Sequence, residues 1–140
     1  LSWTKENCDR IFPNTAWAGY LKDWPGPVEG ERPAAYIIVL VDHSISSNQW
    51  HDQYISAQSI LLGAVESGYG GCIIASVKKK ELGHFIQLPE HLEILYCIAL
   101  GKPKEEVLLE DAVDGNILYY RDEKQVHHVP KRKLEDLIIN

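Results

Sequence analysis

One stretch of the 140-residue chain, Asp52–Pro103, constrains the fold more than any other part of the sequence. It starts with an apolar helical segment and continues through a glycine-rich turn at residues 68–71. Two apolar runs follow, Cys72–Val77 and Ile94–Leu100, and both are typical of strands that are buried on two faces. This order predicts backbone N–H groups, rather than reactive side chains, beside a cavity. A protein built in this way usually holds a cofactor that supplies the chemistry.

Patterns outside this stretch predict further helices and strands. Thr4 is a suitable N-cap for a helix over residues 4–12, and Ser47 or Asn48 is a suitable cap for the helix that runs to about Glu66. The other expected elements are a buried strand at 36–41, a short helix at 79–86, an edge strand at 116–121 and a final helix or turn within 126–140. Helices that alternate with buried strands predict an α/β or α+β protein with a central sheet.

Composition and length narrow the class of protein. The net charge is −6, whereas a general nucleic-acid binder would show a basic face, so we predict no nucleic-acid partner. No apolar run is long enough to span a bilayer, so we predict no membrane partner either. Three cysteines without CxxC or Cys/His ligand spacing argue against structural zinc and predict a reducing, cytoplasmic location. A chain of this length predicts a single domain over residues 1–140.

Sequence motifs of common catalytic chemistry are absent. The chain has no GxSxG, HExxH or P-loop pattern, so we predict no catalytic side chain. The turn at 68–71 follows a helix and precedes a strand, which reverses the order of a dinucleotide-binding fingerprint. His127 and His128 would point to opposite faces of a strand and chelate a metal poorly, which favours surface histidines and no metal site. The cluster Lys78–Lys80 is either a solvated surface run or a contact for a small anion.

A loop over residues 14–33 is rich in Trp, Pro and Gly and carries Trp17, Tyr20 and Trp24. Long aromatic loops in small domains either take part in function or cover an apolar surface. One hypothesis is therefore a lid whose aromatic rings stack on a substrate. The alternative is a loop that roofs the core.

The central stretch resembles the nitroreductase family of flavin enzymes. The matching residues there are Asp52, Ala57, Gln58, Leu61, Leu62, Ala64, Gly68–Ser76, Leu88–Glu90 and Leu100–Pro103. The segments that resemble one branch of the family are Arg10–Phe12, Trp17–Leu21, Arg32–Tyr36 and His127–Arg132. The resemblance covers nearly the whole chain and implies an α+β fold, a three-layer α/β sandwich in which helices flank a mixed central sheet.

The resemblance also implies a function. The family binds FMN at the interface of a homodimer, takes hydride from NAD(P)H and passes it to nitroaromatics, quinones or similar small aromatic acceptors. By position, the flavin ring would lie against the strand residues Ile73, Ile74, Ala75 and Ser76. The backbone N–H groups of Ala75 and Ser76 would face N5 and O4 of the flavin, where fixed donors tune it without reacting. Many members have Glu-Gly at these two positions, and backbone contacts survive that difference.

Two further expectations come from the resemblance. Lys131 and Arg132 match a basic pair that reaches the FMN phosphate, and Trp17, Tyr20 and Trp24 would form the substrate lid. The family begins with a helical segment that bears an Arg-Ser-x-Arg-like phosphate motif, followed by an Asn-containing loop, and this chain has neither. We therefore expect an N-terminally incomplete domain. The alternative function is a truncated, non-catalytic remnant that binds flavin or dimerises.

Overall fold

A computed structural model of the protein describes residues 1–46 and 51–139. Contacts between residues divide the chain into two compact units. Unit 1 comprises Leu1–Trp17 and Gly26–Pro103, and unit 2 comprises Ala18–Pro25 and Lys104–Asn140. Each unit is described by itself, so the single domain that the sequence indicates stays a prediction.

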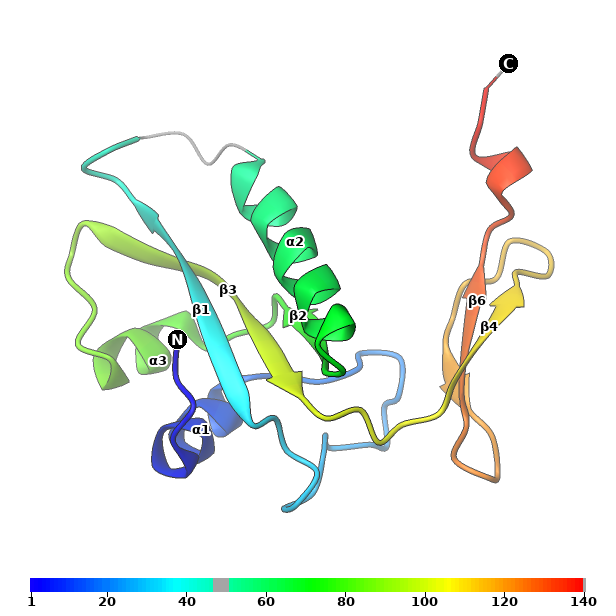
Figure 1. Cartoon of the computed structure of the whole chain (residues 1–140), viewed down its shortest axis with the longest axis horizontal. Coiled ribbons are helices and arrows are strands. Elements are labelled where there is room, and N and C mark those ends of the chain that lie inside the picture. The colour runs from blue at the N-terminus through cyan, green and yellow to red at the C-terminus, as the bar shows by residue number, and fades with distance from the viewer. Residues whose placement is uncertain (47–50, 140) are drawn as a thin grey trace. The chain divides into compact units, whose positions relative to one another are not determined.

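The described part of unit 1 contains a three-stranded sheet and three α-helices. Figure 1 shows how these elements are arranged. In chain order its elements are α1 (Lys5–Ile11), a 3₁₀ turn (Phe12–Asn14), β1 (Ala35–Asp42), α2 (Asp52–Glu66), β2 (Gly70–Ile74), α3 (Lys79–Phe85) and β3 (Leu92–Gly101). The strand order is β1-β3-β2, and both pairs are antiparallel. β3 is therefore the middle strand, and β2 forms one edge of this sheet.

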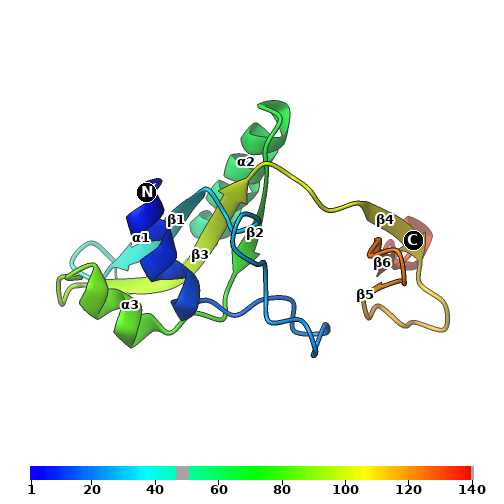
Figure 2. The same cartoon turned by 90° about the horizontal axis from the view of Figure 1, so that it is seen from below.

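Helices cover both faces of this sheet, which gives unit 1 three layers. Figure 2 shows α2 and α3 on opposite sides of the strands. One apolar core joins Cys8 and Ile11 of α1 and Leu82 of α3 to the strands, and the other joins Ala57 of α2 to the opposite face. A β-bulge at Leu95 shifts the pairing of β3 with β1 by one residue. Leu95 and Tyr96 therefore both belong to the core on the side of α2, while Ile94 belongs to the other core.

Local sequence signals fix the ends of the helices. The Thr4 side chain accepts a hydrogen bond from the Asn7 N–H at 3.3 Å, which confirms the predicted cap of α1. At the end of α2, Gly68 has a φ of 75° and its N–H donates to the Val65 carbonyl, while the Tyr69 N–H donates to the Ala64 carbonyl. These two bonds form a Schellman motif. The caps predicted at Ser47 or Asn48 lie outside the described residues.

Unit 2 contains a second three-stranded sheet. Its elements are β4 (Val107–Asp111), β5 (Tyr120–Arg121), β6 (His127–Lys131) and a 3₁₀ turn (Leu134–Asp136). The order is β4-β6-β5, with β4 parallel and β5 antiparallel to β6. The strand predicted at 116–121 is therefore confined to two residues, and the strands at 107–111 and 127–131 were not predicted.

The predicted α+β class is confirmed, and two details differ. Mixed strand pairing occurs in the sheet of unit 2, whereas the sheet of unit 1 is antiparallel. The prediction that Cys72–Val77 is buried on both faces is wrong, because β2 is an edge strand on which Gly71, Cys72 and Ile73 are exposed. Ile74 does face the core. Among the described residues, no helix combines the length and apolar character needed to cross a bilayer.

We predict opposite effects for two glycine-to-alanine substitutions at the end of α2. An added Cβ meets nothing within 4 Å at either Gly63 or Gly68, so the two sites differ mainly in backbone conformation. Gly68→Ala should lower the free energy of unfolding by about 1–2 kcal/mol, because an L-residue is strained at this positive φ. Gly63→Ala should raise it by up to about 1 kcal/mol, because alanine loses less backbone entropy in a helix.

Chemical denaturation of the two variants and the parent chain provides the measurement. Equal effects of the two substitutions would contradict the assignment of a left-handed cap at Gly68.

Candidate functional site

The predicted flavin strand, β2, lies at the edge of the sheet in unit 1. Its five residues pair with Cys97–Gly101 of β3, and the paired region ends at Ile74. Gly71 is required by packing, because an added Cβ would lie 2.5 Å from the Ala99 carbonyl oxygen and 2.9 Å from the Leu61 side chain. The glycine therefore lets β2 approach both β3 and α2 closely.

The chain turns sharply as soon as β2 ends. The Val77 N–H donates to the Ala75 carbonyl at 3.0 Å, which is the hydrogen bond of a γ-turn with Ser76 at its centre. Ser76 is not among the residues with positive φ, so this is the common inverse form of the turn. The Ser76 carbonyl accepts the Ala16 N–H at 2.9 Å, and Thr15 forms a β-bridge with Val77. The segment 75–77 is thus fixed by its own turn and by its contacts with Thr15 and Ala16.

This turn leaves two backbone donors without acceptors. Within residues 1–46 and 51–139, neither the Ala75 N–H nor the Ser76 N–H donates a hydrogen bond to a backbone or side-chain group. Both residues are exposed, so the two N–H groups are not buried unsatisfied donors. Two adjacent donors on a fixed turn are suited to bind an acceptor-rich ligand edge.

The predicted phosphate-binding pair lies in unit 2, at the end of β6. Lys131 is the last residue of that strand, and its carbonyl accepts the Ala112 N–H at 2.8 Å. Among the described residues, the side chains of Lys131 and Arg132 form no ion pair or hydrogen bond, whereas the next residue, Lys133, lies 3.9 Å from Asp111. Two adjacent, exposed cations without carboxylate partners are suited to bind a dianion.

The three predicted lid residues divide between the two units. Trp17 belongs to unit 1, where its ring packs against the core formed with α1 and α3. Tyr20 and Trp24 belong to unit 2: the Tyr20 ring lies 4.8 Å from that of Tyr119, and the Arg121 guanidinium lies 4.4 Å from the ring of Trp24. Trp17 thus fits the alternative of a loop that roofs the core, and a lid made by all three residues stays a prediction.

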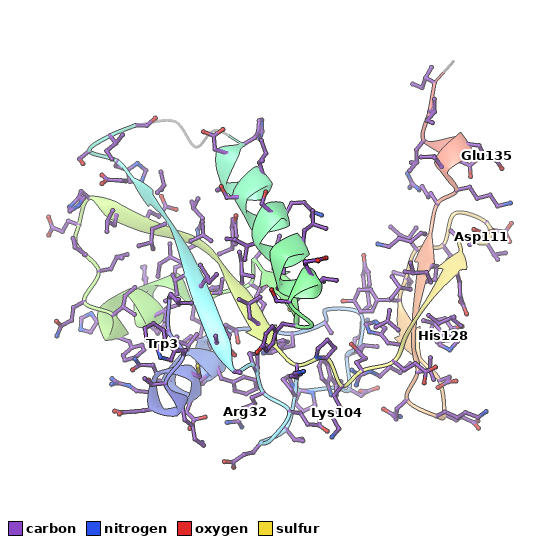
Figure 3. The ribbon with its side chains drawn as sticks, viewed as in Figure 1. Trp3, Arg32, Lys104, Asp111, His128 and Glu135 are labelled. Atoms are coloured by element: carbon purple, nitrogen blue, oxygen red, sulfur yellow. The ribbon has the colours of Figure 1, made fainter. Side chains whose placement is uncertain are left out.

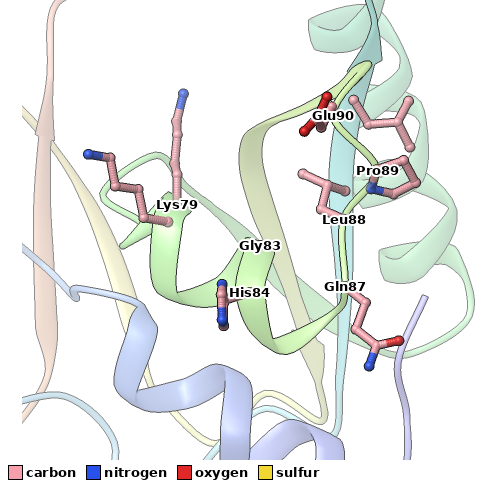
Figure 4. Close-up of a pocket in the computed structure, with 9 residues that line it drawn as sticks. Lys79, Gly83, His84, Gln87, Leu88, Pro89 and Glu90 are labelled. Atoms are coloured by element: carbon pink, nitrogen blue, oxygen red, sulfur yellow. The ribbon is translucent and has the colours of Figure 1, made fainter.

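A separate pocket of about 550 Å³ opens beside α3 (Figure 4). Its lining includes Lys79, His84, Leu88 and Pro89, and none of the predicted flavin residues. The Lys79 ammonium lies 3.3 Å from the Glu93 carboxylate, so part of the basic cluster at 78–80 is already neutralised. Lys78 and Lys80 are exposed.

The two adjacent histidines are not surface residues, so that prediction is wrong. Their side chains are 17% and 14% exposed for His127 and His128, and both lie against carboxylates of unit 2. The error arose because nothing in the local sequence shows that Glu105 and Glu110 pair with β6. Among the described residues, no cluster of three or more His, Cys, Asp or Glu is arranged to hold a metal ion.

Two of the three cysteines, Cys8 and Cys97, are buried and offer no activated thiolate. Burial raises the pKa of the Cys97 thiol to about 11, and burial also raises the pKa of Cys8. Both thiols therefore stay protonated at neutral pH and behave as small core residues.

Comparison with known proteins assigns the chain to a family. Residues 21–102, more than half of the chain, match the nitroreductase family, and the chain therefore belongs to that family. This confirms the resemblance stated from the sequence.

Solved structures agree on the fold. An FMN-dependent nitroreductase from Clostridium difficile R20291 matches 75% of this chain and 62% of its own length, with 19% identity and a TM-score of 0.57. A nitroreductase family protein from Clostridium difficile 630 matches 74% of this chain and 58% of its own length, with 15% identity and a TM-score of 0.56. The present chain thus spans less than two thirds of the length of these relatives.

Proposed function

We propose that the protein is an FMN-dependent oxidoreductase that transfers hydride from NADH or NADPH to a nitroaromatic, quinone or similar acceptor. Membership of the nitroreductase family supports an oxidoreductase that uses a flavin. The observation that carries the proposal is the pair of N–H groups at Ala75 and Ser76, which have no acceptor in the described chain. A cytoplasmic location, which the cysteine pattern predicts, is part of the same proposal.

Each unit, taken by itself, carries residues that suit one part of the flavin. Ala75 and Ser76 supply two donors for the acceptor edge of the ring, and Ile73 and Ile74 supply the strand that precedes them. Lys131 and Arg132 supply charge for the phosphate. When bound, FMN supplies the capacity to accept and release a hydride. The chain itself orients the ring and stabilises charge through fixed backbone dipoles, and the proposal assigns proton delivery to solvent.

The function is tested with the complete chain and added FMN. We expect the protein to bind FMN, to lose flavin absorbance when NADH or NADPH is added without oxygen, and to regain it when a quinone or nitroaromatic follows. FMN binding without bleaching by either nicotinamide would favour the non-catalytic alternative. Failure to bind FMN would contradict the proposal.

The role of the Ser76 N–H is tested by a substitution that removes it. Proline lacks the N–H, and its φ of about −65° is close to the −75° of an inverse γ-turn, so the backbone can remain in place. Ser76→Pro should weaken FMN binding about tenfold, and the matched control Ser76→Ala, which keeps the N–H, should change it little. Equal affinities of the two variants would contradict the donor role, provided that their circular dichroism spectra match that of the parent.

The phosphate contact is tested by removing charges one at a time. Lys131→Gln and Arg132→Gln should each raise the Kd for FMN about tenfold, because each loses a charge-assisted contact with phosphate. Lys133→Gln removes the same charge from the adjacent residue, which already lies near Asp111, and should have a small effect. Riboflavin has no phosphate, so its Kd should be equal in all three variants. If all three substitutions raised the Kd for FMN equally, the lysines and the arginine would act only through their general charge, and a specific contact of Lys131 and Arg132 with the phosphate would be contradicted.

A homodimer is the third part of the proposal, and the exposed face of α2 supports it. Ile55, Leu62 and Val65 are 66%, 61% and 65% exposed; Ile55 and Leu62 lie on the side of the helix away from the buried Ala57, and Val65 lies on the adjoining flank. Apolar side chains that recur on one exposed helix face are typical of an interface. A second copy of the chain is the partner that the proposal assigns to this face.

The interface is tested by placing a charge on it. Leu62→Asp should shift the protein from dimer to monomer in analytical ultracentrifugation, because the carboxylate would be desolvated in the interface. Ser56→Asp adds the same charge to α2 outside this stripe and should leave the dimer intact. A Leu62→Asp variant that stays dimeric would show that α2 does not form the interface.

A further inference from the structure

Unit 2 is held together by few apolar contacts. Within its described part no residue is fully buried, in contrast to the two apolar cores of unit 1. Hydrophobic burial therefore contributes little to the order of the β4-β6-β5 sheet. Its stability must depend more on polar and aromatic contacts than is usual for a sheet.

One side chain, His128, connects all three segments of that sheet. It lies on the middle strand, β6, and Figure 3 shows it among the strands of unit 2. Its Nδ1 is within hydrogen-bond distance of Glu110 on β4, and its Nε2 lies 3.6 Å from the Asp122 carboxylate, just after β5. The ring also stacks on Tyr120 of β5, with centroids 4.7 Å apart and an angle of 7° between the planes.

The two ring nitrogens face two carboxylates, so protonation decides how many contacts the ring can make. A neutral imidazole has one donor and one acceptor nitrogen, whereas imidazolium has two donors. With a neutral ring, one nitrogen lone pair would face the oxygen of Glu110 or Asp122. With a protonated ring, both nitrogens carry a proton toward a carboxylate, one in a hydrogen bond with Glu110 and the other in an ion pair with Asp122.

Among the described residues, His128 is the cation that contacts both Glu110 and Asp122. The Tyr120 hydroxyl lies 3.5 Å from Glu110, and the Asp122 carboxylate accepts backbone N–H groups of Lys124 and Val126 at 2.9 Å. The neighbouring His127 makes a separate contact, 2.9 Å from Glu105. Glu105 is also paired with Arg121 at 2.6 Å, so its charge is balanced whether or not His127 is protonated.

We propose that His128 is a proton-operated clasp that joins β4 to the end of β5 across β6 when it is protonated and loosens the sheet of unit 2 when it is neutral. This proposal does not depend on flavin binding or on the enzymatic function.

The direction of the pH dependence follows from the environment of the ring. The hydrogen bond to Glu110 is the largest cause that raises the pKa of His128 above its ordinary value of 6.5, while partial burial acts in the opposite direction. A raised pKa in the folded state means that the stabilisation is fully present below pH 6.5 and is lost as the pH rises through the folded pKa. The sheet of unit 2 is therefore loosened when the pH rises above the folded-state pKa of His128.

The proposal is tested on the complete chain without cofactor. Amide hydrogen exchange, corrected for the intrinsic effect of pH, reports the protection of β6 and β5, and protection of β3 serves as the internal reference. Protection of β6 should fall as the pH rises through the pKa of His128, which NMR of the ring measures directly. The fall should be about tenfold for each unit by which that pKa exceeds 6.5.

Three variants separate the clasp from a general alkaline loosening. His128→Gln should give low protection of β6 that no longer depends on pH, whereas the neighbouring control His127→Gln should keep the pH dependence of the parent. Glu110→Gln keeps the His128 ring but removes its carboxylate partner, so the fall in protection of β6 should occur at lower pH. Protection of β6 that is independent of pH in the parent, or an unchanged pH dependence in His128→Gln, would overturn the proposal.

Discussion

The arrangement of unit 1 depends on β3, which pairs with both β1 and β2 and carries residues of both apolar cores. Cys97 and Ala99 face α1 and α3, while Tyr96 and Ile98 face α2. The Tyr96 hydroxyl also donates to the Gln53 carbonyl in the first turn of α2. Helices pack on both faces of β3, which fixes its position in unit 1. The strand β2 pairs with β3 in one register, and this pairing ends at Ile74. The position of the candidate site follows from that end.

What β2 provides is backbone geometry rather than reactive side chains. The strand stops at Ile74, and the γ-turn at Ser76 uses the carbonyl of Ala75 while leaving the N–H groups of both residues available. The sharp turn is stabilised by the bridge between Thr15 and Val77. A site of this kind suits a cofactor that brings its own chemistry, because fixed dipoles bind and polarise it at no cost of reorganisation.

Unit 1 could be predicted from the sequence because its strands are long apolar runs and its helices have clear caps. The same reasoning missed β4 and β6 of unit 2, and it predicted six strand residues where β5 has two. β6 contains two histidines and Pro130, which lacks an N–H and argues against a middle strand. Its pairing partner, β4, lies sixteen or more residues earlier in the chain. Glu105 and Glu110, whose carboxylates contact the two histidines, lie next to and on β4. Such long-range pairing leaves no local signal.

The candidate site was predicted by resemblance rather than from the residue pattern. Nothing in the letters Ala75-Ser76-Val77 predicts a γ-turn, because the turn depends on the bridge to Thr15 and on the Ala16 N–H. The exposure of Ile73 was also missed, since a continuous apolar run indicates a strand without telling a middle strand from an edge. Both points concern contacts between distant segments.

The most direct measurement is the NMR response of three consecutive backbone amides during titration of the complete chain with FMN. The Ala75 and Ser76 N–H resonances should shift strongly and become protected from solvent exchange, because each gains an acceptor. The Val77 N–H, which already donates to Ala75, should change little. FMN binding that leaves the Ala75 and Ser76 amides unchanged would contradict the central claim that these two donors hold the flavin.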